Sequence, residues 1–138
     1  MLVIGDADVL VAFADPQHKH HNRVKMICHN LCMRKAHGFF PTTAVCEAVT
    51  VLQSKLERPE LAAYLVDKVN AGVFKLYPVD QEVVLEAIER FNPYGGKGNT
   101  LFDAIIAVIA IRFKADAVFS FDHWYKEIKL KLVEELFL

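Results

Sequence analysis

Short apolar runs alternate with helix-patterned segments along the chain, and this alternation predicts the order of the elements. Apolar or alternating runs, which favour strands, occur at 2–5, 38–40, 73–79 and 117–121. Segments with apolar residues three or four positions apart, which favour helices, occur at 7–15, 18–35, 42–55, 60–70, 81–91 and 101–113. Strands that alternate with helices predict an α/β fold, a three-layer α/β/α sandwich with a mostly parallel central sheet.

Polar residues and glycines mark several of the expected boundaries. Thr42 and Thr43 are candidate N-caps of the helix that follows the second strand, and Asp80 is suited to cap the helix that begins after it. Gly72 is placed to end the helix before it. The strongest loop signal is 92–100, whereas the last segment, 126–138, is compatible with a strand or a helix.

Acidic residues follow the expected strands at their carboxyl ends. Asp6 comes directly after the first strand and Asp122 directly after the run 117–121. Glu47 lies in the first turns of the helix after the second strand, and Asp103 lies in the first turn of the apolar helix 101–113. Because parallel strands end at one edge of a sheet, where ligands of such folds bind, we expect these four acids to share that edge.

Each acid also has a purely structural interpretation, and these alternatives remain open. Thr100 and Asp103 have the spacing of a capping box. Glu47 lies away from the apolar stripe of its helix, as a solvated surface residue would, and Asp122 could begin a turn. Asp8 could be the N-cap of the first helix.

Several ionised carboxylates in one place repel each other, so such a site is stable mainly when a cation lies among them. Ligands that are all oxygen select hard divalent ions such as Mg²⁺ or Mn²⁺. An ion of this kind can activate water and stabilise the charge that develops on a phosphodiester. The four acids therefore indicate hydrolysis of a phosphate ester.

The composition limits the size, the compartment and the partners of the protein. The 138 residues fit one domain, 1–138, and the apolar content of 54% favours an oligomer because it exceeds the roughly 45 to 50% of soluble domains. A net charge of −1 gives no global attraction for nucleic acid, so such binding would need a local basic patch or metal ions. Three cysteines without a disulfide framework, and no apolar run of about 20 residues, favour a cytoplasmic protein with no membrane contact.

Four segments resemble the PIN-domain family of metal-dependent ribonucleases, in particular its single-domain VapC-type toxins. They are "VIGDADVLVAFADPQHKHH", "FFPTTAVCEAVTVL", "NTLFDAIIAVIA" and "AVFSFDHWY", and they occur in the order of the family. The resemblance implies an endoribonuclease that hydrolyses RNA, with Mg²⁺ or Mn²⁺ held by Asp6, Glu47, Asp103 and Asp122. It also implies a homodimer and inhibition by a cognate antitoxin protein.

Four further residues have expected auxiliary or substrate-binding roles. Ser120 matches the hydroxyl residue that the family often has two positions before its last acid, and Asp8 stands where the family commonly has Asn or Ser. Thr100 is the capping partner of Asp103. Lys97, in the glycine-rich loop before it, is expected near a phosphate of the substrate.

Three other interpretations of the sequence compete with the nuclease hypothesis. Asp6-Ala7-Asp8 is similar to the D-x-D motif of haloacid-dehalogenase-type phosphatases, in which the first Asp would be the nucleophile. A non-catalytic module that keeps the PIN fold for protein contacts is the second. The third is a zinc site built from residues of the first helical region, namely His18, His20, His21, Cys28, His29 and Cys32.

Overall fold

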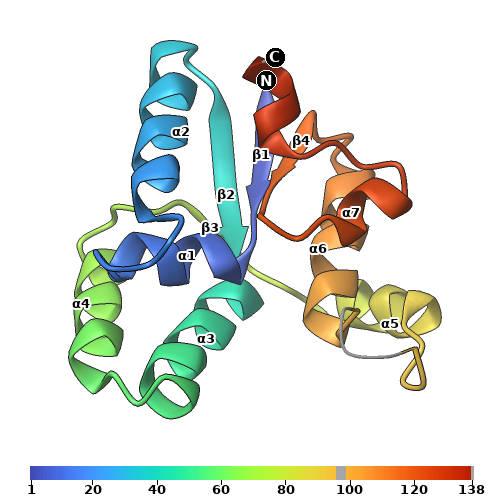
Figure 1. The fold of residues 1–138 in the computed structure, drawn as a ribbon. Helices are drawn as coiled ribbons and strands as arrows, with labels where there is room; N and C mark the ends of the chain where they lie inside the picture. The colour runs from blue at the N-terminus through green and yellow to red at the C-terminus, as the bar shows by residue number, and fades with distance from the viewer. Residues whose placement is uncertain (96–98, 138) are drawn as a thin grey trace.

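Four parallel strands form the central sheet of the computed structural model, which describes residues 1–95 and 99–137. In spatial order they are β3 (Leu76–Tyr77), β2 (His37–Pro41), β1 (Leu2–Gly5) and β4 (Ala117–Phe119) (Figure 1). Ile4 of β1 is paired with Phe39 on one side and with Val118 on the other. The predicted strands are confirmed, although β4 is shorter than the run 117–121 and β3 is a two-residue edge strand.

Seven α-helices, a π-helical turn and a 3₁₀ helix surround this sheet in the described residues. The α-helices are α1 (Ala7–Ala14), α2 (His21–Met33), α3 (Thr42–Thr50), α4 (Pro59–Asn70), α5 (Gln81–Arg90), α6 (Leu101–Arg112) and α7 (Trp124–Glu127). The π-helical turn Val51–Lys55 continues α3, and the 3₁₀ helix Val133–Phe137 ends the described chain. No helix in residues 1–95 and 99–137 is both long enough and apolar enough to cross a bilayer.

Alternate residues of the strands face opposite sides of the sheet, and helices cover both sides. Ile4 and Val118 belong to the larger apolar core, which they share with buried residues of α3 to α6. Val3 and Phe119 face the other side and pack with Val24 of α2 and with the C-terminal segment. This arrangement confirms the predicted three-layer α/β/α fold with a parallel sheet (Figure 1).

The middle of helix α6 is buried on every side. Every residue from Ala104 to Ala110 is buried, because the helix packs against β1, β4, α3 and α5. Its apolar residues therefore need no single preferred face, in agreement with the sequence pattern. This burial fixes the position of the first turn of α6, which carries Asp103.

Two of the predicted helix boundaries are confirmed and one is wrong. The carboxylate of Asp80 accepts a hydrogen bond from the Val83 N–H (3.0 Å) and caps α5, and Gly72 follows α4 with a φ of +77°, a conformation that glycine adopts without strain. The prediction that Thr42 or Thr43 caps α3 is wrong, because the helix begins at Thr42 itself. The Thr42 hydroxyl instead accepts a hydrogen bond from the Val79 N–H (3.1 Å), which ties α3 to the chain after β3.

The C-terminal segment, which the sequence left open, joins the sheet edge before it becomes helical. Leu132 forms an isolated parallel bridge with Val118, and the Val118 N–H donates to the carbonyl of Lys131 (2.8 Å). Leu132 and Val133 are buried, and the chain then turns into the 3₁₀ helix. The segment therefore combines both of the expected structures.

Replacing Gly5 with alanine is expected to lower the free energy of unfolding by about 1 to 3 kcal/mol. Gly5 ends β1, and a Cβ atom added there would overlap the aromatic ring of Phe40 on the neighbouring strand. The ring would have to leave its place against both apolar cores. Urea unfolding of the wild type and of Gly5→Ala measures the effect, and equal midpoints would contradict it.

Candidate active site

Five carboxylates from separate parts of the chain line one cavity of about 230 Å³ at the carboxyl edge of the sheet. They are Asp6, Asp8, Glu47, Asp103 and Asp122. The other lining residues are Ala7, Val11, His18 and Val51. The structure thus brings together the four acids that the sequence places at the carboxyl ends of strands, and it adds Asp8.

Asp6 lies deepest in this group and is 5% exposed. Its Oδ1 atom accepts a hydrogen bond from the N–H of Ala7 (2.7 Å), so that Asp6 is the N-cap of α1. Its Oδ2 atom accepts from the hydroxyl of Tyr125 (2.7 Å). Burial, followed by the charge of Asp8, raises the pKa of Asp6 well above its usual value. The alternative that Asp8 caps this helix is therefore wrong, because Asp6 is the N-cap.

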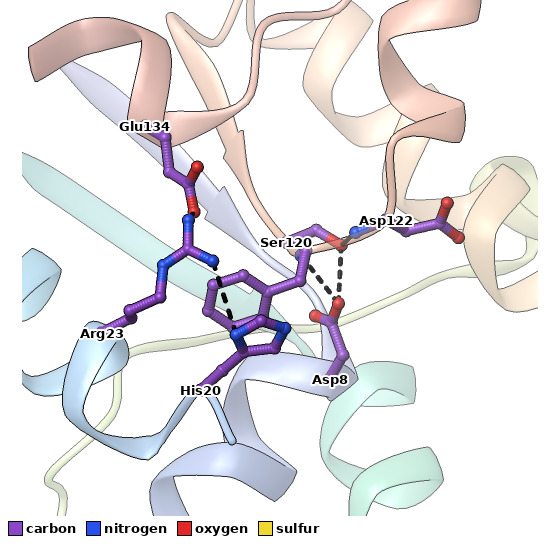
Figure 2. A network of polar contacts seen from close by, with 7 residues as sticks. Asp8, His20, Arg23, Ser120, Asp122 and Glu134 are labelled. Atoms are coloured by element: carbon purple, nitrogen blue, oxygen red, sulfur yellow. Dashed lines mark hydrogen bonds and ion pairs between the residues drawn. The ribbon is translucent and has the colours of Figure 1, made fainter. Parts of the chain in front are cut away.

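Asp8 lies in the first turn of α1 and is tied to the chain after β4 (Figure 2). Its Oδ2 atom accepts hydrogen bonds from the N–H of Phe121 (2.8 Å) and from the hydroxyl of Ser120 (2.9 Å). Its Oδ1 atom is buried and has no hydrogen-bond partner. Burial raises the pKa of Asp8 to about 6.

Ser120 joins three of the acids. Its hydroxyl lies 2.9 Å from Oδ2 of Asp8 and 3.2 Å from Oδ2 of Asp6, and it accepts a hydrogen bond from the N–H of Asp122 (3.0 Å) (Figure 2). Ser120 is 1% exposed, so these contacts are shielded from water. The hydroxyl thereby fixes the spacing between the end of β4 and the start of α1.

Asp103 both caps helix α6 and lines the acid cavity. Its Oδ2 atom accepts from the N–H (3.0 Å) and the hydroxyl (3.1 Å) of Thr100, which completes the predicted capping box of α6. Its Oδ1 atom lies 3.4 Å from the hydroxyl of Tyr125 and faces the group of acids. Burial raises the pKa of Asp103.

Asp122, in the chain between β4 and α7, and Glu47, on α3, are the other two acids that line the cavity. Asp122 accepts a hydrogen bond from the N–H of Trp124 (2.9 Å), so it opens a turn and also lines the cavity. Glu47 is half-buried, and burial together with the charges of Asp103 and Asp8 raises its pKa to about 7. It is therefore not the solvated surface residue that the helix pattern favours by default.

Sequence analysis missed two residues of this site, Tyr125 and His18. Tyr125 is fully buried, and its hydroxyl contacts both Asp6 and Asp103. Burial and these two carboxylates raise its pKa, so the hydroxyl remains protonated and donates. The only local signal was an aromatic residue three positions after Asp122. His18 lines the cavity, and its histidine-rich surroundings had suggested a zinc site.

Two further predictions concern Lys97 and the zinc site. Lys97 lies outside the described residues. In residues 1–95 and 99–137, no three His, Cys, Asp or Glu side chains are grouped closely enough to hold a metal ion as they stand. The six residues of the zinc hypothesis are included in that range, and both Cys28 and Cys32 are exposed on α2. The acids line a shared cavity without meeting at one point.

The donors around the cavity nevertheless fit a hard divalent cation. All five acids offer oxygen, the Oδ1 atom of Asp8 is buried without a partner, and several of the carboxylates are shifted toward the protonated form. Burial is the main cause of each shift, so the ionised carboxylates are costly without a cation among them. A Mg²⁺ or Mn²⁺ ion would supply the missing positive charge.

The family model for the PIN domain matches residues 3–131. The chain belongs to the PIN domain family. This PIN domain is similar in structure to the Mycobacterium tuberculosis protein VapC20, described as a sarcin-ricin loop cleaving toxin, with a TM-score of 0.76 at 13% sequence identity. The likeness covers 93% of this chain and 95% of that chain. Among the curated proteins, none matches the chain by sequence.

The metal-free PIN domain is expected to lose stability as the pH rises from about 4 to 7. Folding raises the pKa of Asp8 to about 6 and that of Glu47 to about 7, so the folded state holds protons that the unfolded state releases near pH 4. This stabilisation is complete at a pH below the pKa values of the unfolded state. It is lost as the pH rises through the pKa values of the folded state. For Asp8, whose pKa rises from 3.8 to about 6, the whole loss is on the order of 3 kcal/mol.

Thermal unfolding in a chelator at pH 4.5 and pH 7.5 measures this effect. Asp8→Asn is the informative variant, because the asparagine carbonyl still accepts from the N–H of Phe121 while the buried charge is gone. The difference in melting temperature between the two pH values is expected to shrink in this variant. An unchanged difference would show that Asp8 is not the source.

Proposed function

We propose that this PIN domain is an endoribonuclease that hydrolyses RNA phosphodiester bonds with a bound Mg²⁺ or Mn²⁺ ion. The observation that carries the proposal is the single cavity lined by five carboxylates, one of which has a buried oxygen without a partner. Such a concentration of uncompensated acids costs stability and is useful when a cation and a phosphate must be held together.

Each acid has a proposed role in this reaction. Asp6, Glu47, Asp103 and Asp122 would hold the ion, directly or through water, and Asp8, whose Oδ1 atom is buried without a hydrogen-bond partner, lines the same cavity. The bound ion supplies a Lewis acid that activates water and stabilises the charge that develops on the phosphate. The carboxylates orient the attacking water through their remaining lone pairs.

Two uncharged residues position these acids. The hydroxyl of Tyr125 fixes Oδ2 of Asp6 and approaches Oδ1 of Asp103, while the hydroxyl of Ser120 fixes Asp8 relative to Asp122. Both residues are buried, so their hydrogen bonds are not exchanged with water. Such supporting contacts keep ligands in place and are comparable to the outer-shell partners of metal sites.

The structural relative supports RNA as the substrate, since that protein is described as a toxin that cleaves the sarcin-ricin loop. By the same likeness, the proposal includes a toxin role for this chain, a cognate antitoxin as its partner, and a homodimer. Light scattering after size exclusion tests the homodimer. Co-expression with the protein encoded next to it tests the antitoxin.

Purified protein is expected to cleave single-stranded or structured RNA in Mn²⁺, and this cleavage is expected to disappear in EDTA and in Asp103→Asn. Asparagine can keep the pairing with Thr100, so α6 should still form, but it removes one charge from the cavity. Gel electrophoresis of labelled RNA measures cleavage. Asp80→Asn is the matched control, because Asp80 also caps a helix but does not line the cavity.

Activity that survives both the chelator and Asp103→Asn would contradict the nuclease proposal. Metal-dependent release of phosphate from a monoester, with a phosphorylated Asp6, would instead support the phosphatase alternative. That alternative is disfavoured by the burial of Asp6 and by the hydrogen bonds to both of its oxygens. Mn²⁺ binding without cleavage of any RNA would favour the non-catalytic module.

A further inference from the structure

The acid cavity alone would repel RNA, because each nucleotide that flanks the cleaved bond also carries a negative phosphate. A strand that reaches this cavity needs positive groups on the surfaces next to it. Two further hollows lie beside the acids, and Arg23 lines one of them and Lys55 the other. They are lined by different residues and approach the acids from different elements.

The first hollow, of about 80 Å³, lies between the start of α2, the chain after β4 and the C-terminal segment. Arg23 projects into it and is held on three sides. Its guanidinium lies over the ring of Phe121 (5.4 Å to the ring centre), donates to Nδ1 of His20 (3.5 Å), and forms an ion pair with Glu134 (Figure 2). The ring of His20 is itself stacked on Phe121 (4.2 Å between centres).

Hydrogen bonds link two residues that line this hollow to the acid Asp8. Ser120 lines it, and the hydroxyl of Ser120 donates to Asp8. The N–H of Phe121 also donates to Asp8, so the residue that supports Arg23 through its ring supports the acid site through its backbone. Arg23 is thus a fixed cation whose present partner, the carboxylate of Glu134, is a half-exposed anion that a phosphate could replace.

The second hollow, of about 360 Å³, lies along α3 and the π-helical turn that follows it. It shares Glu47 and Val51 with the acid cavity, and Lys55, at the end of the π-helical turn, also lines it. The ring of Phe102 also lines it and is 40% exposed. A cation beside an exposed aromatic ring is suited to a nucleotide, since bases stack on such rings.

We propose that one strand of RNA crosses the acid cavity between these two hollows, with a backbone phosphate on Arg23 in place of Glu134 and another phosphate on Lys55. The inference rests on the proposed function, and it assigns the RNA-binding residues on either side of the acids. Glu134 is then an internal competitor for the substrate. Its removal strengthens RNA binding, while removal of Arg23 or Lys55 weakens it.

The test is the affinity of a short fluorescein-labelled single-stranded RNA of mixed sequence, measured by anisotropy in Mn²⁺ with Asp103→Asn as the uncleaving background. Arg23→Ala and Lys55→Ala are each expected to weaken binding about five- to tenfold. Each is also expected to reduce the slope of log affinity against log salt concentration by about 0.7, the value for one phosphate contact on a single strand.

Glu134→Gln is expected to tighten binding about two- to threefold, and this gain is expected to vanish when Arg23 is also alanine. Arg23→Lys is expected to keep the salt slope, since the charge remains. Arg112→Ala is the matched control: Arg112 forms an ion pair of similar exposure with Glu86 at the far end of α6, and its loss should leave RNA binding unchanged.

A purely structural role of the ion pair would give a different pattern. Arg23→Ala and Glu134→Gln would then lower the melting temperature alike and leave RNA affinity at the level of Arg112→Ala, which would overturn the proposal. An effect at Arg23 or at Lys55 alone would also overturn it, because a crossing strand must reach both. If the wild type cleaves RNA and these variants bind it normally, only this inference fails; if the wild type neither binds nor cleaves RNA, the proposed function fails.

Discussion

Replacing Asp6 with asparagine is expected to lower the rate of RNA cleavage in Mn²⁺ by more than about 100-fold, because even outer-shell partners of metal sites commonly cost 10- to 100-fold. Asparagine can keep the cap bond from the N–H of Ala7, but it removes the charge that a divalent ion needs. Burial raises the pKa of Asp6, so loss of the charge is expected to raise the melting temperature of the metal-free protein. Initial cleavage rates and circular-dichroism melting curves measure the two effects.

Asp116→Asn is the matched control for this experiment. Asp116 also accepts a hydrogen bond from a backbone N–H of the chain around β1, that of Leu2 (2.7 Å), but it does so at the opposite end of the strand. Its replacement should leave cleavage unchanged. Equal cleavage rates of the Asp6 and Asp116 variants would show that Asp6 has no role in cleavage.

Replacing Tyr125 with phenylalanine is expected to weaken Mn²⁺ binding about 10- to 100-fold. The ring would keep its packing, but Oδ2 of Asp6 would lose its shortest hydrogen bond, and Asp103 would lose a contact on its inner side. Both carboxylates would then be less fixed in position. Calorimetric titration with Mn²⁺ measures the affinity, and cleavage rates at increasing Mn²⁺ concentrations show whether excess metal restores activity.

A positioning role for Tyr125 predicts that saturating Mn²⁺ restores most of the cleavage rate. Tyr64→Phe is the control, because Tyr64 is exposed on α4, away from the acids. An unchanged metal affinity in Tyr125→Phe would show that the hydroxyl serves only the stability of the core. A rate that stays low at saturating Mn²⁺ would contradict a role through metal binding alone.

The placement of Asp6 and Asp103 was predictable because local rules fix both. Asp6 follows a short buried strand, and a carboxylate at that point must lie at the carboxyl edge of a parallel sheet. Asp103 follows Thr100 at the spacing of a capping box and begins a helix that is apolar on all sides, so its side chain has few places to go. Both inferences depend only on residues within one turn or strand.

Glu47 and Asp8 were less predictable, for two physical reasons. The side of α3 that carries Glu47 looks polar in the sequence, and it is half-buried only because α1 and α6 pack beside α3. Asp8 and Asp6 compete for the same cap position, and the pattern could not decide between them. The N–H of Ala7 donates to Asp6, so Asp6 is the N-cap of α1. Asp8 is therefore free to contact Ser120.

The sequence by itself determined the α/β order of the elements, the parallel sheet and the edge at which the acids gather, because strand and helix periodicity are local properties. Only the tertiary structure decided how the acids are held. The hydroxyls of Ser120 and Tyr125 reach Asp6 across more than 100 residues of chain, and the ion pair between Arg23 and Glu134 spans a similar separation. Contacts of this kind arise from packing between distant segments, and no local pattern encodes them.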